Sequence, residues 1–225
     1  MTQELWLQLA ELYAPTMYLD EHEPFKPIRV GISYLEEKGP SPSFARQLNF
    51  EPEQVKGVLE YAVYWDYDIQ HLYDLEHVWV NIGHQGEVVR CEASFHGKYF
   101  LGLLPDRSNL EQETHVKLLV QAGKHAFSPI PELFQLHPDV PAFTDERAGV
   151  GGVLVPDMFT GSFAADERLN ELAEQHLRTF RFQAANRYWK YEWPDGIFVT
   201  WQQLKHEIPV RMNELLRRIS DESND

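Results

Sequence analysis

The sequence contains a single cysteine, Cys91, among its 225 residues. One cysteine excludes an intramolecular disulfide and fits a reducing compartment, so a cytoplasmic location is expected. The chain also has no run of about 18 apolar residues, the length needed to span a bilayer, so no membrane span is expected. Its opening, MTQELWLQLAEL, lacks the basic and then apolar regions of a secretory signal.

Basic residues are also few. The chain has only 20 Lys and Arg residues against 35 Asp and Glu residues, which gives a formal net charge of −15. Nucleic acids and anionic membrane surfaces select for basic patches, so neither is an expected partner. Most acidic side chains stay in water, and the excess is first interpreted as ordinary solvated surface.

Hydrophobic residues make up 43% of the chain, enough for a single domain over residues 1–225 with a sizeable core. Segments rich in Val, Tyr, Trp and Phe recur between turn residues, at 57–65, 75–82, 87–96 and 115–123. They are typical of an antiparallel sheet. We therefore predict a mainly β fold: an antiparallel β-sandwich with peripheral helices and a helical C-terminal segment, its sandwich core spanning 15–160.

Other segments flank these strands. Helical spacing of leucines before Pro15 predicts a short N-terminal helix. Two prolines interrupt residues 16–35, which predicts an irregular segment leading into an edge strand, and residues 38–47 are expected to form a loop. The glycines at both ends of residues 83–86 predict a hairpin turn.

The C-terminal third has helical patterns. A stripe of apolar residues predicts a helix that starts near Asp166, and Thr200 with Gln203 forms a capping-box pattern for a last helix. We expect the helices of residues 161–219 to pack on the sandwich, and residues 220–225 to form a disordered tail. The sequence leaves open whether these helices cover the sandwich or join two copies, so a homo-oligomer is compatible with it.

The densest group of polar side chains lies beside a strand. Residues 61–80, YAVYWDYDIQHLYDLEHVWV, place carboxylates and imidazoles between two runs of aromatic and β-branched residues. Burying such groups without a partner is costly, and a bound divalent cation removes that cost. The pattern predicts a metal site whose candidate ligands in this stretch are Asp66, Asp68, His71, Asp74 and Glu76.

Two histidines outside this stretch extend the candidate ligands. His125 follows an apolar strand and a glycine, where sheet ends present functional side chains. His96 lies on the return strand of the hairpin, so the hairpin register decides its role. If Ile82 pairs with Glu87, His96 lies on the side opposite to the carboxylates. If Ile82 pairs with Val88, His96 faces them, and the glycines of the turn allow a bulge that shifts the register by one residue.

Three short blocks, in the same order, resemble known families. The block HLYDLEH at 71–77 resembles the His-Arg-His-Asp-Trp-Glu heptad region of the necrosis- and ethylene-inducing-peptide-like cytolysins. It is also similar to the Gly-Asp-Trp-Glu-His segment of the vacuolar protein sorting-associated protein 62 family. The blocks SFHG at 94–97 and GKHA at 123–126 are similar to two further elements of that second family, as is the opening segment with YAP at 13–15 and EPF at 23–25.

The resemblance implies a β-sandwich with a divalent cation at one end. In the cytolysins the first His, the Asp and the Glu of the heptad hold a calcium- or magnesium-type ion beside a pocket for a sphingolipid sugar head group. These positions correspond to His71, Asp74 and Glu76, and an upstream Asp of that family corresponds to Asp66 or Asp68. The missing secretion signal, the missing disulfide and the helical C-terminus argue against a secreted toxin.

A metal-dependent hydrolase is the first functional hypothesis. A bound cation lowers the pKa of a water molecule and polarises a phosphoryl or carbonyl oxygen. His77 or Glu92 is then the candidate general base, and Lys98 or Lys124 the candidate group for an anionic part of the substrate.

The alternatives are a binding module and a structural metal site. In a binding module the cation coordinates the hydroxyls of a sugar or lipid head group, and Trp65, Tyr67 and Ser94 are candidate contacts for that ligand. In a structural site the ion only joins strand ends. Imidazole-rich coordination favours zinc or manganese and oxygen-rich coordination favours calcium or magnesium, and the sequence leaves this open.

Overall fold

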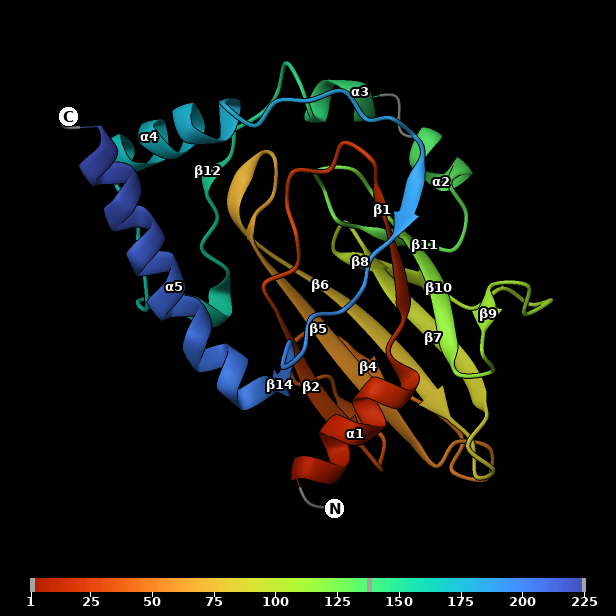
Figure 1. Ribbon diagram of the computed structural model, residues 1–225. Coiled ribbons are helices and arrows are strands. Elements are labelled where there is room, and N and C mark those ends of the chain that lie inside the picture. The colour runs from red at the N-terminus through yellow and green to blue at the C-terminus, as the bar shows by residue number, and fades with distance from the viewer. Residues whose placement is uncertain (1–2, 137–138, 224–225) are drawn as a thin grey trace.

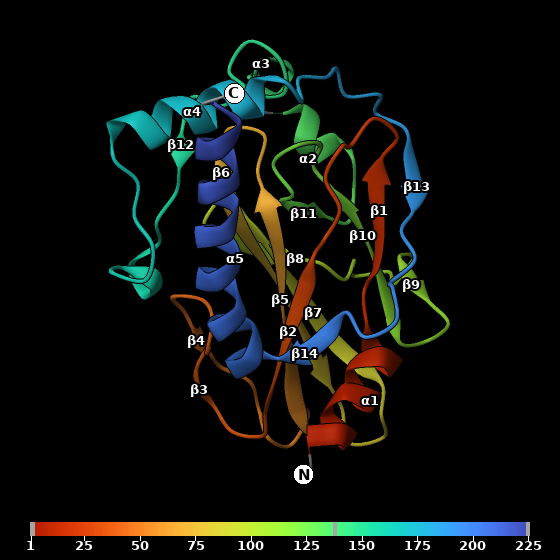
Figure 2. The same ribbon diagram turned by 60° about the vertical axis from the view of Figure 1, so that its left-hand side comes forward.

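Two β-sheets packed face to face form the body of the protein (Figure 1). The computed structural model describes residues 3–136 and 139–223. The prediction of a mainly β sandwich with peripheral helices and a helical C-terminal segment is confirmed. Both views place helix α1 at one end of the sandwich and the region of α2, α3 and α4 at the other end (Figures 1 and 2).

The larger sheet has seven strands, in the order β14-β2-β5-β6-β7-β8, with β12 beside β6. Its centre is the antiparallel pair of β5 and β6, the two longest strands. The pairs β14–β2 and β12–β6 are parallel, so the sheet is mixed rather than purely antiparallel. Its strands are β2 (Arg29–Leu35), β5 (Gly57–Tyr67), β6 (His71–Ile82), β7 (Val88–Phe95), β8 (Lys98–Leu101), β12 (Gly152–Val153) and β14 (Phe198–Thr200).

The smaller sheet has five strands, in the order β11-β10-β1-β13, with β9 also paired with β10. Here β1 and β10 run parallel although they are distant in sequence. Residues 16–35 differ from the expectation, because they form β1 in this sheet and β2 inside the larger one. The strands are β1 (Thr16–Asp20), β9 (Leu110–Glu111), β10 (His115–Val120), β11 (Phe127–Ser128) and β13 (Tyr188–Lys190).

The core between the sheets follows from the alternation of side chains along each strand. On β6, Val78, Val80 and Ile82 point into it, and they meet Val116 and Leu118 of β10. The other face of β5 and β6 is also covered, so β5 is buried over nearly its whole length. This explains why the sequence of β5 is almost continuously apolar rather than alternating.

The cover on that second face is helix α5 (Trp201–Glu222), with α4 (Glu167–Arg178) beside it (Figure 2). Asp166 and Thr200 cap these two helices by accepting from the backbone N–H groups of Leu169 and Gln203, as predicted. Helix α5 runs to Glu222, so it includes the start of the segment expected to be a disordered tail. Residues 224–225 of that tail lie outside the described residues.

Short elements complete the chain. None of the helices within the described residues has the length and apolar character that crossing a membrane requires. The segment expected to be a loop after β2 contains a small hairpin of its own. These elements are α1 (Gln3–Tyr13), β3 (Gly39–Pro40), β4 (Gln47–Leu48), α2 (Glu132–Gln135), α3 (Val140–Phe143) and the 3₁₀ turn η1 (Asp157–Phe159).

The predicted β6–β7 hairpin is present and contains a bulge. Ile82 pairs with Val88, as in the second of the two registers considered, but the register then shifts so that Asn81 pairs with Arg90. The shift continues along the strands and places Val78 opposite Ala93. The bulge therefore decides the register beyond the turn, and neither simple pairing holds along the whole hairpin.

Candidate functional site

A hollow of about 470 Å³ opens at the end of the sandwich where β5 turns into β6. We call it the acidic hollow. Its polar side consists of Asp68, His71, Asp74, Glu76, His77, His96 and Lys124. Its apolar side comes from two other segments, through Phe44 and through Leu154, Pro156 and Met158. Most of the predicted ligands therefore gather on one surface.

Unusual backbone geometry accompanies this gathering. Tyr73, His96 and His125 have φ values of 77°, 50° and 53°. Such positive φ values are uncommon for residues other than glycine, and they persist only where the surrounding structure holds them. All three residues lie in or beside the blocks that carry the candidate ligands.

His71 is oriented by its own strand. Its Nδ1 lies 2.9 Å from the carbonyl oxygen of Tyr73. A carbonyl only accepts hydrogen bonds, so Nδ1 donates to it, and in the neutral ring this tautomer leaves the lone pair on Nε2. Nε2 is on the side of Asp68, 3.9 Å from Oδ2. An imidazole held in this way has the tautomer that a metal ligand requires.

Asp74 is paired with a buried histidine from the other sheet. Nδ1 of His125 lies 2.8 Å from Oδ2 of Asp74, and Nε2 of His125 lies 3.6 Å from Glu23. The His125 ring is fully buried and stacks on Trp65 at 4.4 Å between ring centres. Burial alone would lower the pKa of His125, but the two carboxylates outweigh burial and raise this pKa to about 10. His125 is therefore a buried cation at neutral pH.

Asp68 is paired with a lysine. Nζ of Lys124 lies 2.8 Å from Oδ1 and 2.6 Å from Oδ2 of Asp68. Oδ1 also accepts from the backbone N–H of Gln70 at 2.6 Å. Burial alone would raise the pKa of Asp68, but His71 and Lys124 outweigh burial and lower it.

Glu76 has no such cation. Its carboxylate accepts a hydrogen bond from the hydroxyl of Ser94, which in turn accepts from the backbone N–H of His77. Burial and the neighbouring Asp74 carboxylate raise the pKa of Glu76 to about 8. Two carboxylates close together in a buried place destabilise each other's charged form.

These donors suit a cation that prefers oxygen ligands. Three buried carboxylates and the His71 imidazole face the acidic hollow, and among the described residues one of these carboxylates, that of Glu76, makes no direct ion pair. In the part of the chain that the structure describes, no three His, Cys, Asp or Glu side chains are already arranged as a ligand set. Two of the carboxylates already contact cationic side chains: Lys124 pairs with Asp68, and His125 pairs with Asp74.

Other predicted site residues lie outside the hollow. Asp66 accepts two hydrogen bonds from Arg211 of α5, at 3.0 and 2.7 Å. Glu92 accepts from Arg46 and Arg90, each at 2.7 Å. Lys98 is exposed on β8. Trp65 is buried against His125, and Tyr67 stacks on Phe25 on another part of the surface.

His77 lines the hollow but lies in an aromatic cage. Its ring stacks on Trp79 at 5.6 Å and meets the edge of Phe44 at 5.0 Å. Among the described residues neither ring nitrogen has a partner in good hydrogen-bond geometry, although the Ser43 backbone lies close enough to interact with the ring. Burial lowers the pKa of His77 to about 3, against a smaller opposing effect of the Ser43 backbone, so the ring is neutral at physiological pH.

Several contributors were not recognised in the sequence. Glu23 holds the turn of the third block, because its carboxylate accepts from the backbone N–H of Gly123 at 2.6 Å. Its only signal was its place in the EPF segment. Phe44 and the apolar residues Leu154 and Met158 come from loops without a pattern, and only the tertiary fold brings them to the hollow.

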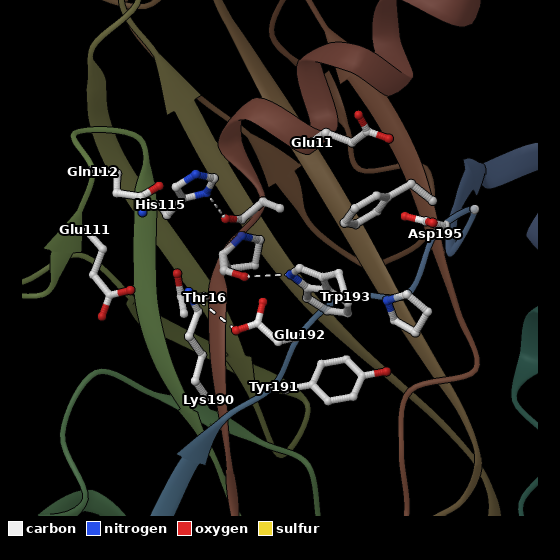
Figure 3. Close-up of a pocket in the computed structure, with 15 residues that line it drawn as sticks. Glu11, Thr16, Glu111, Gln112, His115, Lys190, Tyr191, Glu192, Trp193 and Asp195 are labelled. Carbon is white, nitrogen blue, oxygen red and sulfur yellow. Dashed lines mark hydrogen bonds and ion pairs between the residues drawn. The ribbon is translucent and has the colours of Figure 1, made fainter.

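A second hollow, of about 360 Å³, lies beside α1 (Figure 3). Two aromatic side chains that line it are hydrogen-bonded to the backbone just after α1. Trp193 donates to the carbonyl oxygen of Pro15 at 3.0 Å, and His115 donates to the carbonyl oxygen of Ala14 at 2.7 Å. Glu111 accepts from the hydroxyl of Tyr18 at 3.2 Å. This hollow is a seam between α1, β10 and the segment after β13.

The fold and the acidic hollow together define a β-sandwich that carries buried carboxylates and imidazoles at one end. No protein-family model matches the chain, and no curated protein matches it. The resemblance to the vacuolar protein sorting-associated protein 62 family therefore remains an expectation from the three sequence blocks.

Solved structures of NLPPya are weakly similar. The complex of NLPPya with glucosamine shares 16% identity at a TM-score of 0.37, over 69% of this chain and 87% of that chain. The complex of NLPPya with mannosamine shares 16% identity at a TM-score of 0.36, over 79% of this chain and 90% of that chain. These values define neither the fold nor the function, and the fold assignment rests on the sheets described above.

Proposed function

We propose that the acidic hollow binds a divalent cation of the calcium or magnesium type and, through it, a small ligand rich in hydroxyl groups, such as a sugar. Asp68, Asp74 and Glu76 would supply oxygen ligands, and His71 would supply Nε2. The observation that carries the proposal is that three buried carboxylates line one hollow and that, among the described residues, Glu76 makes no direct ion pair.

Electrostatics supports a cation at this place. The raised pKa of Glu76 shows that its charged form is destabilised by burial and by Asp74. A divalent cation reverses both effects, because it attracts each carboxylate and replaces the lost water. Carboxylate oxygens are the ligands that calcium and magnesium prefer.

The shape of the hollow supports a ligand beside the cation. The hollow is open to solvent, so coordination by water or ligand hydroxyls is sterically allowed. A site that only joined strand ends would be closed. Leu154, Pro156 and Met158 form an apolar wall next to the carboxylates. Such a wall suits the C–H face of a sugar ring, whose hydroxyls would reach the cation.

Binding is favoured over hydrolysis by the surroundings of the two candidate bases. Glu92 is held by two arginines and does not line the hollow. His77 is enclosed by Phe44 and Trp79, and its pKa is far below the range useful for a general base at neutral pH. Neither group is poised to take a proton from a water in the hollow.

Calorimetric titration of chelator-treated protein with Ca²⁺, Mg²⁺, Mn²⁺ and Zn²⁺ tests the cation site. We expect Ca²⁺ or Mg²⁺ to bind, and Glu76→Gln or Asp74→Asn to weaken binding by about tenfold or more, since removing even a supporting group costs about 10–100-fold. Glu37→Gln changes an exposed carboxylate outside the hollow and should bind as the wild type does.

The ligand part of the proposal is tested by saturation-transfer NMR with a panel of neutral and amino sugars, with and without the bound cation. Signals that need both the cation and Glu76 support the proposal. Absence of any cation binding would refute the cation site. Binding of Zn²⁺ alone would show that imidazoles, not carboxylates, dominate the site.

A further inference from the structure

Lys124 lines the acidic hollow, beside the carboxylates proposed as ligands. Its side chain is only 11% exposed, and its ammonium contacts both carboxylate oxygens of Asp68. With Gln70 also donating to Oδ1, the oxygens that would face a metal ion are already engaged. The lysine therefore stands where a cation would bind.

The backbone under Lys124 is held firmly. Gly123 has a φ of 69°, and a Cβ at this position would lie 2.8 Å from the side chain of Ile69. Its N–H donates to Glu23, and the N–H of His125 donates to the carbonyl of Gln121 at 2.9 Å. The turn is thus fixed, and only the flexible four-carbon side chain of Lys124 is free to change position.

The two buried cations near the hollow have different freedom. His125 is fully enclosed between Asp74 and Glu23, so it has no route to solvent. Lys124 lies at the lining of the hollow, and its side chain is partly exposed to solvent. Of these two cations, only Lys124 can break its ion pair without a rearrangement of the core.

We infer that Lys124 is a tethered, displaceable cation: it holds Asp68 while no metal ion is bound and must leave for a divalent cation to bind. This inference rests on the proposed cation site. It reverses the sequence-based role of Lys124 as a contact for an anionic substrate group. In this role Lys124 neutralises the buried Asp68 carboxylate in the metal-free protein. It competes with the divalent cation for Asp68 and so lowers the affinity for that cation. Once displaced, its ammonium group moves to the mouth of the hollow.

Amine labelling measures the displacement directly. Protein is treated with an N-hydroxysuccinimide ester of acetate, with and without saturating Ca²⁺, and acetylation at each lysine is quantified by peptide mass spectrometry. We expect Ca²⁺ to speed labelling of Lys124 by about tenfold, the change that loss of about 1.4 kcal/mol of ion-pair energy produces. Exposed Lys205 should not respond. In Glu76→Gln, which should not bind the cation, labelling of Lys124 should not respond either.

Substitution of Lys124 gives a second readout. Lys124→Met removes the competing charge, so Ca²⁺ should bind about tenfold more tightly by calorimetry. Lys124→Arg keeps a charged side chain on Asp68 and should not tighten binding. If Ca²⁺ binds the wild type but Lys124 labelling stays unchanged, the inference fails while the cation site stands. If neither the wild type nor Lys124→Met binds any divalent cation, both fail.

Discussion

His77 is a buried imidazole enclosed by Phe44 and Trp79, and its ring nitrogens have no well-formed hydrogen bond to any described residue. A buried polar group without a partner costs about 1–3 kcal/mol of stability. Its lowered pKa adds an acid-dependent cost. The unfolded chain takes up a proton below the usual histidine pKa of about 6.5, whereas the folded protein does so only near 3. The contribution of neutral His77 to the free energy of unfolding is therefore fully present above pH ~6.5 and is lost as the pH falls towards 3.

Replacing this ring by an apolar one should stabilise the fold. We expect His77→Phe to raise the free energy of unfolding by about 1 kcal/mol at pH 7, and by about 2 kcal/mol more at pH 5, where the wild type carries the protonation cost. Urea unfolding at the two pH values measures both. His206→Phe changes an exposed histidine on α5 and should leave the pH dependence unchanged. A variant that loses stability equally at both pH values would show that the imidazole has a structural partner.

For individual residues, the sequence predicted which side chains lie together better than it predicted their ion-pair partners. Asp74 and Glu76 are two residues apart on one strand, so the alternation of side chains was enough to place them together. The pairing of His125 with Glu23 joins residues about a hundred positions apart, and that of Glu92 with Arg46 depends on a loop. No local pattern encodes such pairs, because burial and charge compensation are decided by the tertiary fold.

Among the elements, the small β3–β4 hairpin depends on one buried carboxylate. Glu60, in the middle of β5, is fully buried and accepts from the hydroxyls of Ser41 and Ser43, each at 2.5 Å, and from Trp79 Nε1 at 2.8 Å. The same hairpin carries Phe44, which forms a wall of the acidic hollow. Glu60 thus links the central strand to the edge of the site.

Glu60→Gln should loosen this hairpin. The amide presents an NH₂ group to donors that need an acceptor, so we expect a loss of about 2–4 kcal/mol of stability, in the range of a buried hydrogen bond to a charged group or somewhat above it. Proteolysis within residues 41–46 should become faster. Glu51→Gln is the control: the Glu51 side chain is 68% exposed and pairs with Lys38 at the surface. Its loss should change the free energy of unfolding by less than about 0.5 kcal/mol. Equal effects of the two substitutions would contradict the role given to Glu60.

The sequence predicted the long elements and missed the short ones. The strands β5, β6, β7 and β10 and the capped helices α4 and α5 have enough residues to show a period or a cap. Strand β1 is five residues long and is paired in parallel with a strand about a hundred residues away, so its conformation comes from that partner. The bulge in the β6–β7 hairpin likewise depends on packing that the turn sequence does not specify.

For the whole molecule, the dominant long-range term is the net charge of −15. Like charges repel in the folded state, and dissolved salt screens them over a Debye length of about 8–10 Å at physiological ionic strength. We expect NaCl, raised from a few millimolar to about 0.15 M, to increase the midpoint of thermal unfolding by about 2–4 °C. At matched ionic strength, Ca²⁺ should raise the midpoint of thermal unfolding further, because it binds only the folded state. The Glu76→Gln variant should keep the increase caused by NaCl and should not show the increase caused by Ca²⁺. A midpoint that falls with NaCl would show that ion pairs, not repulsion, dominate the surface.

The position of β14 and α5 has a consequence for biosynthesis. Strand β14 pairs in parallel with β2, near the start of the chain, and α5 covers the outer face of β5 through Trp201, Leu204 and Ile208. During vectorial synthesis β14 and α5 emerge after β2 and β5, so a nascent chain that has already made β2 and β5 exposes an apolar sheet face until α5 has been made. Burial of this sheet face therefore waits for α5, and a chain interrupted before α5 would offer that face to chaperones or to aggregation.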